Sequence, residues 1–324
     1  MLRKILIAII VVVAVGAVIF ALGPRIPVDT TVTFDAAAIG ADPDAYLAER
    51  ESRFDDIREG LEKEIVWAYP ASRAKTPLAI VYVHGFSSSK GEVRPLPDIV
   101  ARELAANMFY TRLTGHGRDD DAMAEGTVNA WVNDLAEAVE IGRRIGEKVV
   151  VVATSTGGGL TAWGATQPPL LDDVAGLVLI SPLFGLKDPM SAMLTWPWGG
   201  TLAELVVGEY RSNKPRSELQ AKVNTMRYPT RAILPVAAVA GMAHAADYRN
   251  VGIPVLFLIS DGDRVVRPDL TRQIAKTWGG EAEVVTVEGA DDPSQHVIAG
   301  DALSPSTTEP LAARAVEWIR KTVR

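Results

Sequence analysis

The sequence predicts an α/β domain built on a mostly parallel central sheet with helices on both faces, preceded by one apolar N-terminal helix. Two observations support this prediction. Short β-branched segments alternate with longer helical patterns through most of the chain, which is typical of parallel strands joined by helices. The first 24 residues have a different composition, because they carry no charged residue after Lys4.

Residues 1–24 predict a transmembrane anchor. Arg3 and Lys4 precede an apolar segment of roughly 18 uncharged residues, Ile5 to Leu22, which is close to the length that spans a bilayer. A cleaved signal peptide has the same order of features and remains an alternative. The positive-inside rule keeps a basic N-terminus in the cytoplasm, so we expect the rest of the chain on the opposite side of the membrane.

Composition excludes several classes of site. The net charge of −7 argues against a nucleic-acid surface, which needs clustered Lys and Arg. The chain contains no cysteine, which removes disulfides, thiolate metal ligands and cysteine nucleophiles. Hydrophobic residues make up 48% of the chain, enough for a sizeable core.

The body of the chain divides into three parts. Residues 25–74 are polar, with a helix-forming stretch, and predict a spacer and lead-in to the domain. Strand–helix alternation then predicts a core formed by residues 75–182 and 251–324. We expect strands at 78–86, 108–113, 148–154, 174–181, 253–260 and 282–288, and helices at 96–107, 131–146, after Pro268 and at 310–323.

The alternation stops between Ser181 and Val251. An insertion of roughly 70 residues without clear strands is too long for a loop, so residues 183–250 predict a small helical subdomain. Its place in an open sheet predicts that it covers the carboxyl ends of the strands, where such sheets bind ligands.

The stretch VVVVATSTGGGL (149–160) predicts a strand that turns sharply into a helix. Such an elbow presents a nucleophilic Ser, with small residues two positions to either side so that strand and helix can approach. The central residue needs a positive φ, which costs more for a β-branched residue than for Ser. This selects Ser155 over Thr154 and Thr156, with Ala153 and Gly157 as the flanking small residues.

The same glycines suggest a nucleotide site as an alternative, because residues 157–162 fit the dinucleotide pattern G-x-G-x-x-A. No Asp or Glu stands at the end of the next strand, near Ser181, to bind a ribose. The unit also lies in the middle of the sheet, and a phosphate-binding G-x-x-x-x-G-K-[ST] motif is absent. The sequence therefore disfavours a nucleotide cofactor.

A serine nucleophile needs a base and an acid, and both stand at later strand ends. The chain has four histidines, and His296 lies between the last strand and the last helix. Asp261 and Asp263 follow the preceding strand. The order Ser155, then Asp, then His296 is that of a hydrolase triad on a doubly wound sheet. His84 and His116 are interpreted as loop-structuring residues and His244 as incidental.

The chain resembles the α/β-hydrolases of the monoacylglycerol lipase and carboxylesterase type, which carry a helical lid. The resemblance covers roughly residues 75 to 323. It rests on VYVHGFSSS (81–89), LTGHGRDDD (113–121) with Trp131 and Asp134 downstream, the Ser155 elbow, and DGDRVV (261–266) with HVIAGD (296–301). The family pattern places the acid before x-Val-Val, which favours Asp263. Ala153 departs from the pattern, which has Gly there.

The resemblance implies a serine hydrolase that cleaves carboxylic esters through an acyl-enzyme and needs no metal and no cofactor. The implied substrate is a small molecule, an acyl ester of the lipid-like or monoacylglycerol type. It implies oxyanion donors at the backbone N–H groups of Phe86 and Thr156. Residues of the lid are candidates for an acyl pocket or for the lid's own core: Met190, Met193, Leu194, Trp196 and Trp198. An acyltransferase and a non-catalytic binding protein on the same fold remain alternatives.

Overall fold

The computed structural model describes residues 1–323, and a seven-stranded sheet forms its centre. The strands of this sheet are β1 Glu64–Val66, β2 Thr76–Val83, β3 Asn107–Tyr110, β4 Gly146–Thr154, β5 Val174–Ile180, β8 Val255–Ile259 and β9 Ala282–Thr286. Their order is β1-β3-β2-β4-β5-β8-β9, and all neighbours are parallel except β1 and β3. The predicted mostly parallel sheet is confirmed; β1 was not expected, because three residues give no periodicity to detect.

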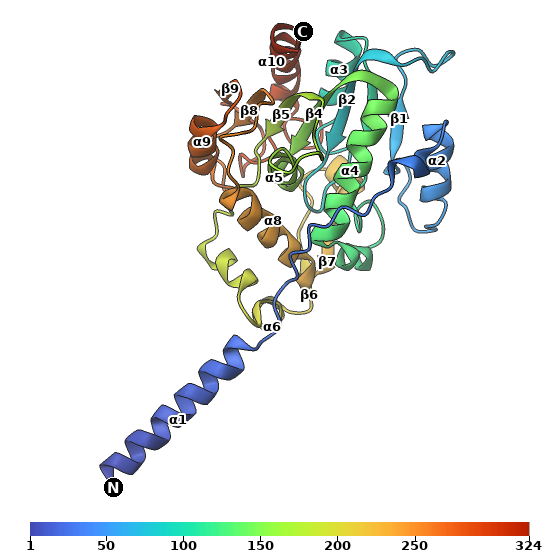
Figure 1. Cartoon of the computed structure of the whole chain (residues 1–324). Coiled ribbons are helices and arrows are strands. Elements are labelled where there is room, and N and C mark those ends of the chain that lie inside the picture. The colour runs from blue at the N-terminus through green and yellow to red at the C-terminus, as the bar shows by residue number, and fades with distance from the viewer. Residues whose placement is uncertain (324) are drawn as a thin grey trace.

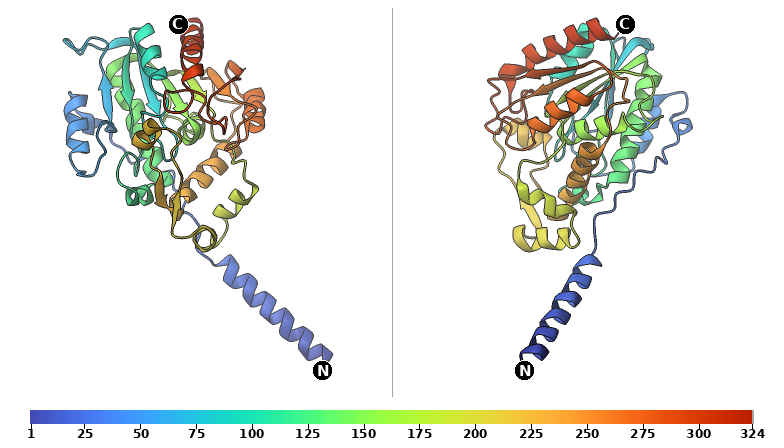
Figure 2. Two further views of the ribbon diagram at one scale, coloured as in Figure 1. Left: turned by 180° about the vertical axis from the view of Figure 1, so that it is seen from behind. Right: turned by 60° about the vertical axis from the view of Figure 1, so that its left-hand side comes forward.

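Helices cover both faces of the sheet, as the two views of Figure 2 show. On one face lie α3 Leu96–Glu103 and α10 Pro305–Thr322. On the other face lie α4 Val128–Ile145, α5 Ser155–Gly164, α8 Leu234–Ala245 and α9 Pro268–Thr277. Successive strand residues point to opposite faces, so Val81 packs in the cluster of α4 and Tyr82 in the cluster of α10.

The N-terminal helix α1, Leu2–Ala21, projects away from this domain (Figure 1). It is the one helix in residues 1–323 that is long and apolar enough to cross a membrane, and residues 3–21 are exposed along their length. A signal sequence meets the same description. Residues 25–35, expected as part of a spacer, run along α4, where Oδ1 of Asn133 accepts hydrogen bonds from the N–H groups of Thr33 and Phe34.

Short elements complete the chain on either side of the core. The lead-in contains η1 Ala36–Ile39 and α2 Pro43–Glu51, and η2 Asp121–Glu125 precedes α4. The insertion contains η3 Pro189–Thr195, α6 Gly199–Val207, β6 Tyr210–Ser212, α7 Glu218–Val223, β7 Arg227–Pro229 and η4 Thr230–Ile233, before α8. β6 and β7 form an antiparallel pair, so the expectation of an insertion without strands is wrong in this detail. Each of the two strands is too short to show an alternating pattern.

Candidate active site

Ser155 stands at the junction between β4 and α5, at the carboxyl edge of the sheet. Its φ is +50°, in the left-handed region, so the chain turns sharply from strand to helix at this residue. A Cβ added to Gly157 would lie 2.4 Å from the carbonyl oxygen of His84, and one added to Gly159 would lie 2.3 Å from that of Leu183. These two glycines therefore let α5 approach the segments that follow β2 and β5.

Three side chains at this edge form one hydrogen-bonded chain. Nε2 of His296 lies 2.9 Å from Oγ of Ser155, and Nδ1 of His296 lies 2.8 Å from Oδ2 of Asp263. Since a carboxylate only accepts, Nδ1 carries the proton and Nε2 is free to accept from the serine hydroxyl. The structure thus brings together the three residues selected from the sequence as nucleophile, base and acid.

Asp263 and Asp261 occupy different environments. Asp263 is buried, and its other oxygen, Oδ1, accepts from the backbone N–H groups of Val265 and Val266 at 2.7 and 2.9 Å. The carboxylate of Asp261 is exposed and pairs with Arg272 at 2.8 Å. Only Asp263 faces the imidazole of His296, as the spacing before Val265-Val266 indicated.

The electrostatic surroundings of His296 favour its charged form. Burial lowers the pKa of the imidazole, but the hydrogen bond to Asp263 and the charges of Asp263, Glu92 and Asp292 outweigh burial and raise the pKa above its ordinary value. An imidazole in this setting accepts a proton readily and holds it as a stabilised cation.

The residues expected to supply oxyanion donors, Phe86 and Thr156, belong to segments that adjoin Ser155. Thr156 is in the first turn of α5, where N–H groups have no partner inside the helix. Phe86 follows Gly85, and a Cβ on Gly85 would approach the Cβ of Ser155 to 3.1 Å, so this loop runs close to the serine.

His84 fixes the loop before Phe86. Its Nδ1 donates to the carbonyl of Gly85 at 2.8 Å, and its Nε2 accepts from the N–H of Leu113 at 3.0 Å. Burial lowers the pKa of His84 to about 4, so the ring is neutral and can accept at Nε2. His116 donates from Nδ1 to the carbonyl of Thr114. Both imidazole rings therefore bind backbone groups of the loops around them, which agrees with the interpretation of His84 and His116 as loop-structuring residues.

The model of the alpha/beta hydrolase family matches residues 80–302, more than half of the chain. The chain belongs to the alpha/beta hydrolase family. It is 28% identical over 260 residues to a thermostable monoacylglycerol lipase from Bacillus sp. (strain H-257), covering 78% of this chain and 95% of that protein. The resemblance inferred from the motifs and the α/β-hydrolase fold are thereby confirmed.

Solved structures with the same fold include lipases and esterases. A structure from the metagenome-derived lipolytic enzymes LipS and LipT has a TM-score of 0.67 at 23% identity, covering 82% of this chain and 99% of its own. A soluble variant of monoglyceride lipase from Saccharomyces cerevisiae, in complex with a substrate analogue, has a TM-score of 0.58 at 14% identity and covers 82% of this chain and 94% of its own. At these identities the likeness concerns the fold.

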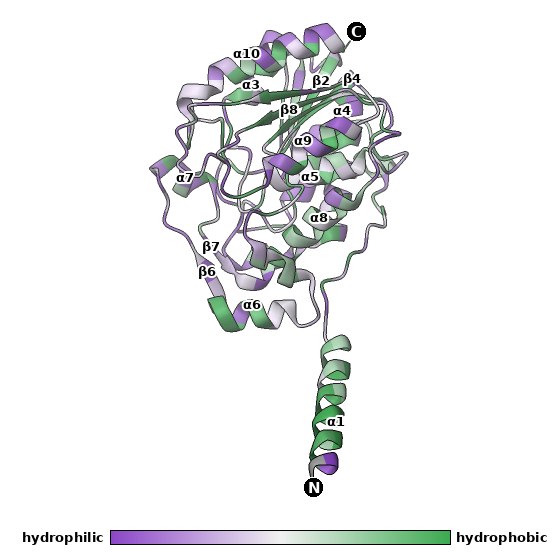
Figure 3. Ribbon diagram, turned by 90° about the vertical axis from the view of Figure 1, so that its left-hand side faces the viewer, coloured by the Kyte–Doolittle hydropathy of each residue, from purple (hydrophilic) through white to green (hydrophobic). Residues whose placement is uncertain are grey.

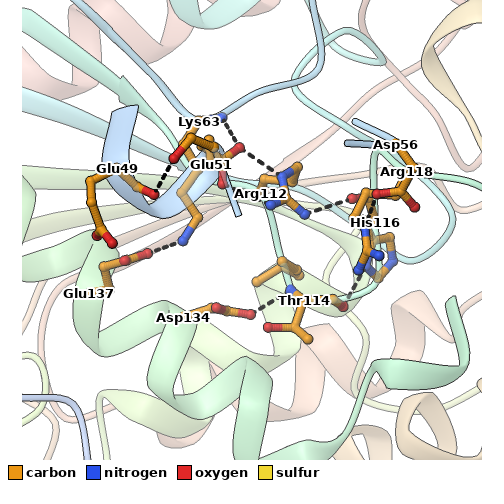
Figure 4. Close-up of polar contacts among 12 residues, drawn as sticks. Glu49, Glu51, Asp56, Lys63, Arg112, Thr114, His116, Arg118, Asp134 and Glu137 are labelled. Atoms are coloured by element: carbon orange, nitrogen blue, oxygen red, sulfur yellow. Dashed lines mark hydrogen bonds and ion pairs between the residues drawn. The ribbon is translucent and has the colours of Figure 1, made fainter. Parts of the chain in front are cut away.

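Charged side chains hold the loop of residues 112–118 (Figure 4), and His116 of this loop packs against His84 and Phe86. The N–H of Thr114 donates to Oδ2 of Asp134 at 2.6 Å, and Arg112 forms an ion pair of 2.7 Å with Glu51. Lys63 pairs with Glu137 beside them. Burial, together with the charge of Glu137, raises the pKa of Asp134 to about 6, against the opposing charge of Lys63 and the hydrogen bonds from Thr114.

The residues of the insertion that were candidates for an acyl pocket differ in exposure. Met190 and Trp196 are exposed, and Met193 is half-buried. The indole of Trp198 donates to the carbonyl of Ile19 at 3.2 Å, so this ring contacts α1. The ring of Trp198 therefore lies against the N-terminal helix. An acyl pocket lined by Met190, Met193, Leu194 and Trp196 stays a prediction.

Another part of the insertion, residues 216–225, contacts segments of the candidate active site. The N–H of Thr225 donates to the carbonyl of Ser87, and Nδ2 of Asn224 donates to the buried carboxyl of Glu92 at 2.6 Å. Arg216 pairs with Asp292, which lies near His296. The sequence did not predict these contacts, because each one joins residues far apart in the chain and none belongs to a recognisable motif.

Proposed function

We propose that this chain is a serine hydrolase that cleaves carboxylic esters through an acyl-enzyme, with Ser155, His296 and Asp263 as its triad. The hydrogen-bonded chain from Ser155 through His296 to Asp263 carries the proposal. Membership of the alpha/beta hydrolase family supports it, as does the order of the three residues along the chain.

In the acylation step, Oγ of Ser155 attacks the ester carbonyl while Nε2 of His296 takes the hydroxyl proton. Asp263 holds Nδ1–H and stabilises the imidazolium. The carbonyl oxygen becomes an oxyanion, which accepts from the N–H groups of Phe86 and Thr156; each such donor contributes roughly 3 kcal/mol in comparable sites. The tetrahedral intermediate collapses, the ester C–O bond breaks, and His296 gives its proton to the departing alkoxide.

In the second step, water takes the place of the alcohol. His296 removes a proton from water, the hydroxide attacks the acyl carbon, and the proton returns to Oγ of Ser155 as the carboxylic acid leaves. An alcohol in place of water gives acyl transfer by the same steps, which is the runner-up function. A binding protein without catalysis is the remaining alternative.

Lipid-like esters of the monoacylglycerol type are the proposed substrates. The similarity to a monoacylglycerol lipase over 95% of that protein's length supports this class. An apolar N-terminal helix is consistent with it, since an enzyme held at a bilayer is near esters that dissolve in lipid.

Covalent labelling and turnover test this function together. A fluorophosphonate probe is expected to label the wild-type chain and to leave Ser155→Ala unlabelled. Hydrolysis of a p-nitrophenyl ester series and of a monoacylglycerol is expected from the wild type alone. Labelling of Ser155→Ala would remove Ser155 as the nucleophile. Ester exchange with an added alcohol faster than hydrolysis would favour the acyltransferase.

We further propose that α1 anchors the chain with its N-terminus in the cytoplasm and the hydrolase domain on the opposite side. Arg3 and Lys4 before the apolar segment support this orientation. Protease added outside cells with a permeable outer layer is expected to cleave the domain, and full protection would reject the orientation. A mature form that begins near Gly23 would support a signal peptide in place of the anchor.

A further inference from the structure

The insertion of residues 183–250, which is the predicted lid, exposes an apolar surface at the end of α6. Leu205 and Val206 are 80% and 74% exposed, and Val207 is 51% exposed. Apart from residues 1–22, Leu205 and Val206 are the most exposed large apolar side chains in residues 1–323. Contiguous exposed apolar patches mark sites of interaction with proteins or membranes.

The other end of α6 is joined to α1. Trp198, which directly precedes α6, donates its backbone N–H to the carbonyl of Pro24 at 2.8 Å and its indole N–H to the carbonyl of Ile19 at 3.2 Å. A Cβ on Gly23 would lie 2.0 Å from Nε1 of Trp198, so the contact requires glycine at that position. Trp198 thus connects the lid to the point where α1 ends.

The orientation of α6 relative to α1 suits a membrane surface. Figure 3 shows α6 lying across the direction of α1, next to the end of that helix, with hydrophobic residues at its free end. A helix that crosses a bilayer places its end in the interfacial region, and a helix held crosswise there lies in the plane of the interface. Tryptophan, such as Trp198 and the exposed Trp196, is enriched at that depth.

We propose that α6 lies in the surface of the bilayer that α1 crosses, with the side chains of Leu205, Val206 and Val207 among the lipids and Trp198 as the joint between the two helices. The hydrolase is then attached at two points, and its lid contacts the lipid phase. This proposal rests on the proposed anchor, and its consequence for substrate capture rests on the proposed esterase function.

A single introduced cysteine tests the position of α6, because the chain has no cysteine of its own. The full-length variant Leu205→Cys carries an environment-sensitive fluorophore and is reconstituted in phosphatidylcholine–phosphatidylglycerol vesicles with and without nitroxide-labelled lipid. The matched control is Ala71→Cys, an exposed residue in the loop before β2. We expect blue-shifted emission and strong nitroxide quenching at Leu205 and neither at Ala71.

The alternatives give different signals in this experiment. Emission at Leu205 equal to that at Ala71 would overturn the proposal, since the helix would then face water. Blue-shifted emission without nitroxide quenching would also overturn it, because a protein surface such as a second copy of the chain would then cover α6. Neither signal depends on ester hydrolysis, so this result is separate from the test of the triad.

Rates of ester hydrolysis test whether contact between α6 and the bilayer promotes capture of lipid substrates. In the double variant Leu205→Ser/Val206→Ser, we expect hydrolysis of a long-chain monoacylglycerol within the vesicles to fall by about tenfold. Hydrolysis of water-soluble p-nitrophenyl acetate should remain within about twofold, since neither residue touches Ser155 or its partners. Leu219→Ser, in α7 of the same insertion, is the control and should change neither rate. Equal losses on both esters would reject a role in lipid contact.

Discussion

The buried carboxylate of Asp292 accepts a hydrogen bond from the backbone N–H of His296, at 3.1 Å between Oδ2 and N. The same oxygen accepts from the N–H of Val297 at 3.0 Å, and Oδ1 accepts from the N–H of Ser294 at 3.1 Å. One carboxylate therefore organises the loop that carries the proposed catalytic base. Arg216 pairs with it, which ties that loop to the insertion between β5 and β8.

Removing this carboxylate should lower activity by misplacing His296. In Asp292→Ala, the N–H groups of His296 and Val297 lose a buried acceptor, and each unsatisfied group costs about 1–3 kcal/mol. We expect kcat to fall by about 10²-fold with a smaller change in KM, since the base loses its alignment with Ser155. Steady-state kinetics and thermal unfolding measure the two effects.

The neighbouring carboxylate supplies the control. Asp291 is exposed and accepts from the N–H and Oγ of Ser306, at the start of α10. Asp291→Ala is expected to leave kcat within about twofold of the wild type, because exposed substitutions away from a site have small effects. A comparable fall of kcat in both variants would argue against a specific role for Asp292.

The acid of the triad can be assigned by a pair of isosteric substitutions. Asp263→Asn favours the wrong tautomer of His296, and we expect kcat to fall by about 10⁴-fold, as for the corresponding change in a serine protease triad. Asp261→Asn, which weakens an exposed pair with Arg272, should change kcat by less than about twofold. Loss of activity in Asp261→Asn alone would reassign the acid.

The succession of the longer strands along the chain and the residues at their ends were predictable from the sequence, because both rest on local patterns. β4 is a run of Val residues that must be buried on both faces, and the turn after it requires small residues around Ser155. The spacing before Val265-Val266 then distinguished Asp263 from Asp261. Such signals need only the residues that lie next to each other in the chain.

The contacts that position the site were not predictable, because they join distant parts of the chain. Asp292 was visible only as one of two adjacent aspartates, and nothing in the sequence says which one is buried. Arg216 contacts it from the insertion. Asn133 accepts hydrogen bonds from residues 33 and 34, about a hundred positions away, within the predicted spacer and lead-in. A single sequence holds no record of such pairs.

Adding a methyl group at Gly157 should harm stability and labelling more than removing one at Ala153. Gly157→Ala places a Cβ 2.4 Å from the carbonyl oxygen of His84, so we expect a loss of about 1–3 kcal/mol in stability and weak fluorophosphonate labelling. Ala153→Gly only removes a buried methyl group, which should cost about 1 kcal/mol and preserve labelling. Thermal unfolding and labelling rates compare the two. Equal behaviour would contradict the packing argument.

The raised pKa of His296 predicts where the acid limb of the pH profile lies. Only the neutral imidazole can accept the proton of Ser155, so kcat/KM should fall as the pH drops through a pKa above 6.5. The same raised pKa stabilises the folded chain below pH 6.5, and this contribution is lost as the pH rises through the folded-state value.

The variant Asp263→Asn tests whether the charge of Asp263 raises the pKa of His296. With the charge of Asp263 removed, burial remains and lowers the pKa of His296, so the acid limb of the residual activity should move to lower pH. The profile is measured on a soluble ester whose own chemistry does not change with pH. An acid limb that stays in place would mean that another group produces it.

Asp134 is half-buried, and its carboxyl is desolvated. Replacing this carboxyl with the neutral amide of Asn should therefore raise stability in a pH-dependent way. Burial raises its pKa from 3.8 to about 6, so the folded chain retains a proton between about pH 4 and pH 6 that the unfolded chain has lost. Stability should therefore fall as the pH rises through this window, and above pH 6 the cost of the buried charge is complete, about 3 kcal/mol.

Asp134→Asn removes the charge but keeps an acceptor for the N–H of Thr114, whereas Asp134→Ala removes both. We expect the Asn variant to be more stable than the wild type at pH 8 and the difference to shrink towards zero near pH 4. The Ala variant should be destabilised relative to Asn at every pH, because Thr114 then has no buried partner. Denaturant unfolding across this range measures both. A pH-independent gain for Asn would show that packing, and not the charge of Asp134, limits stability beneath the site.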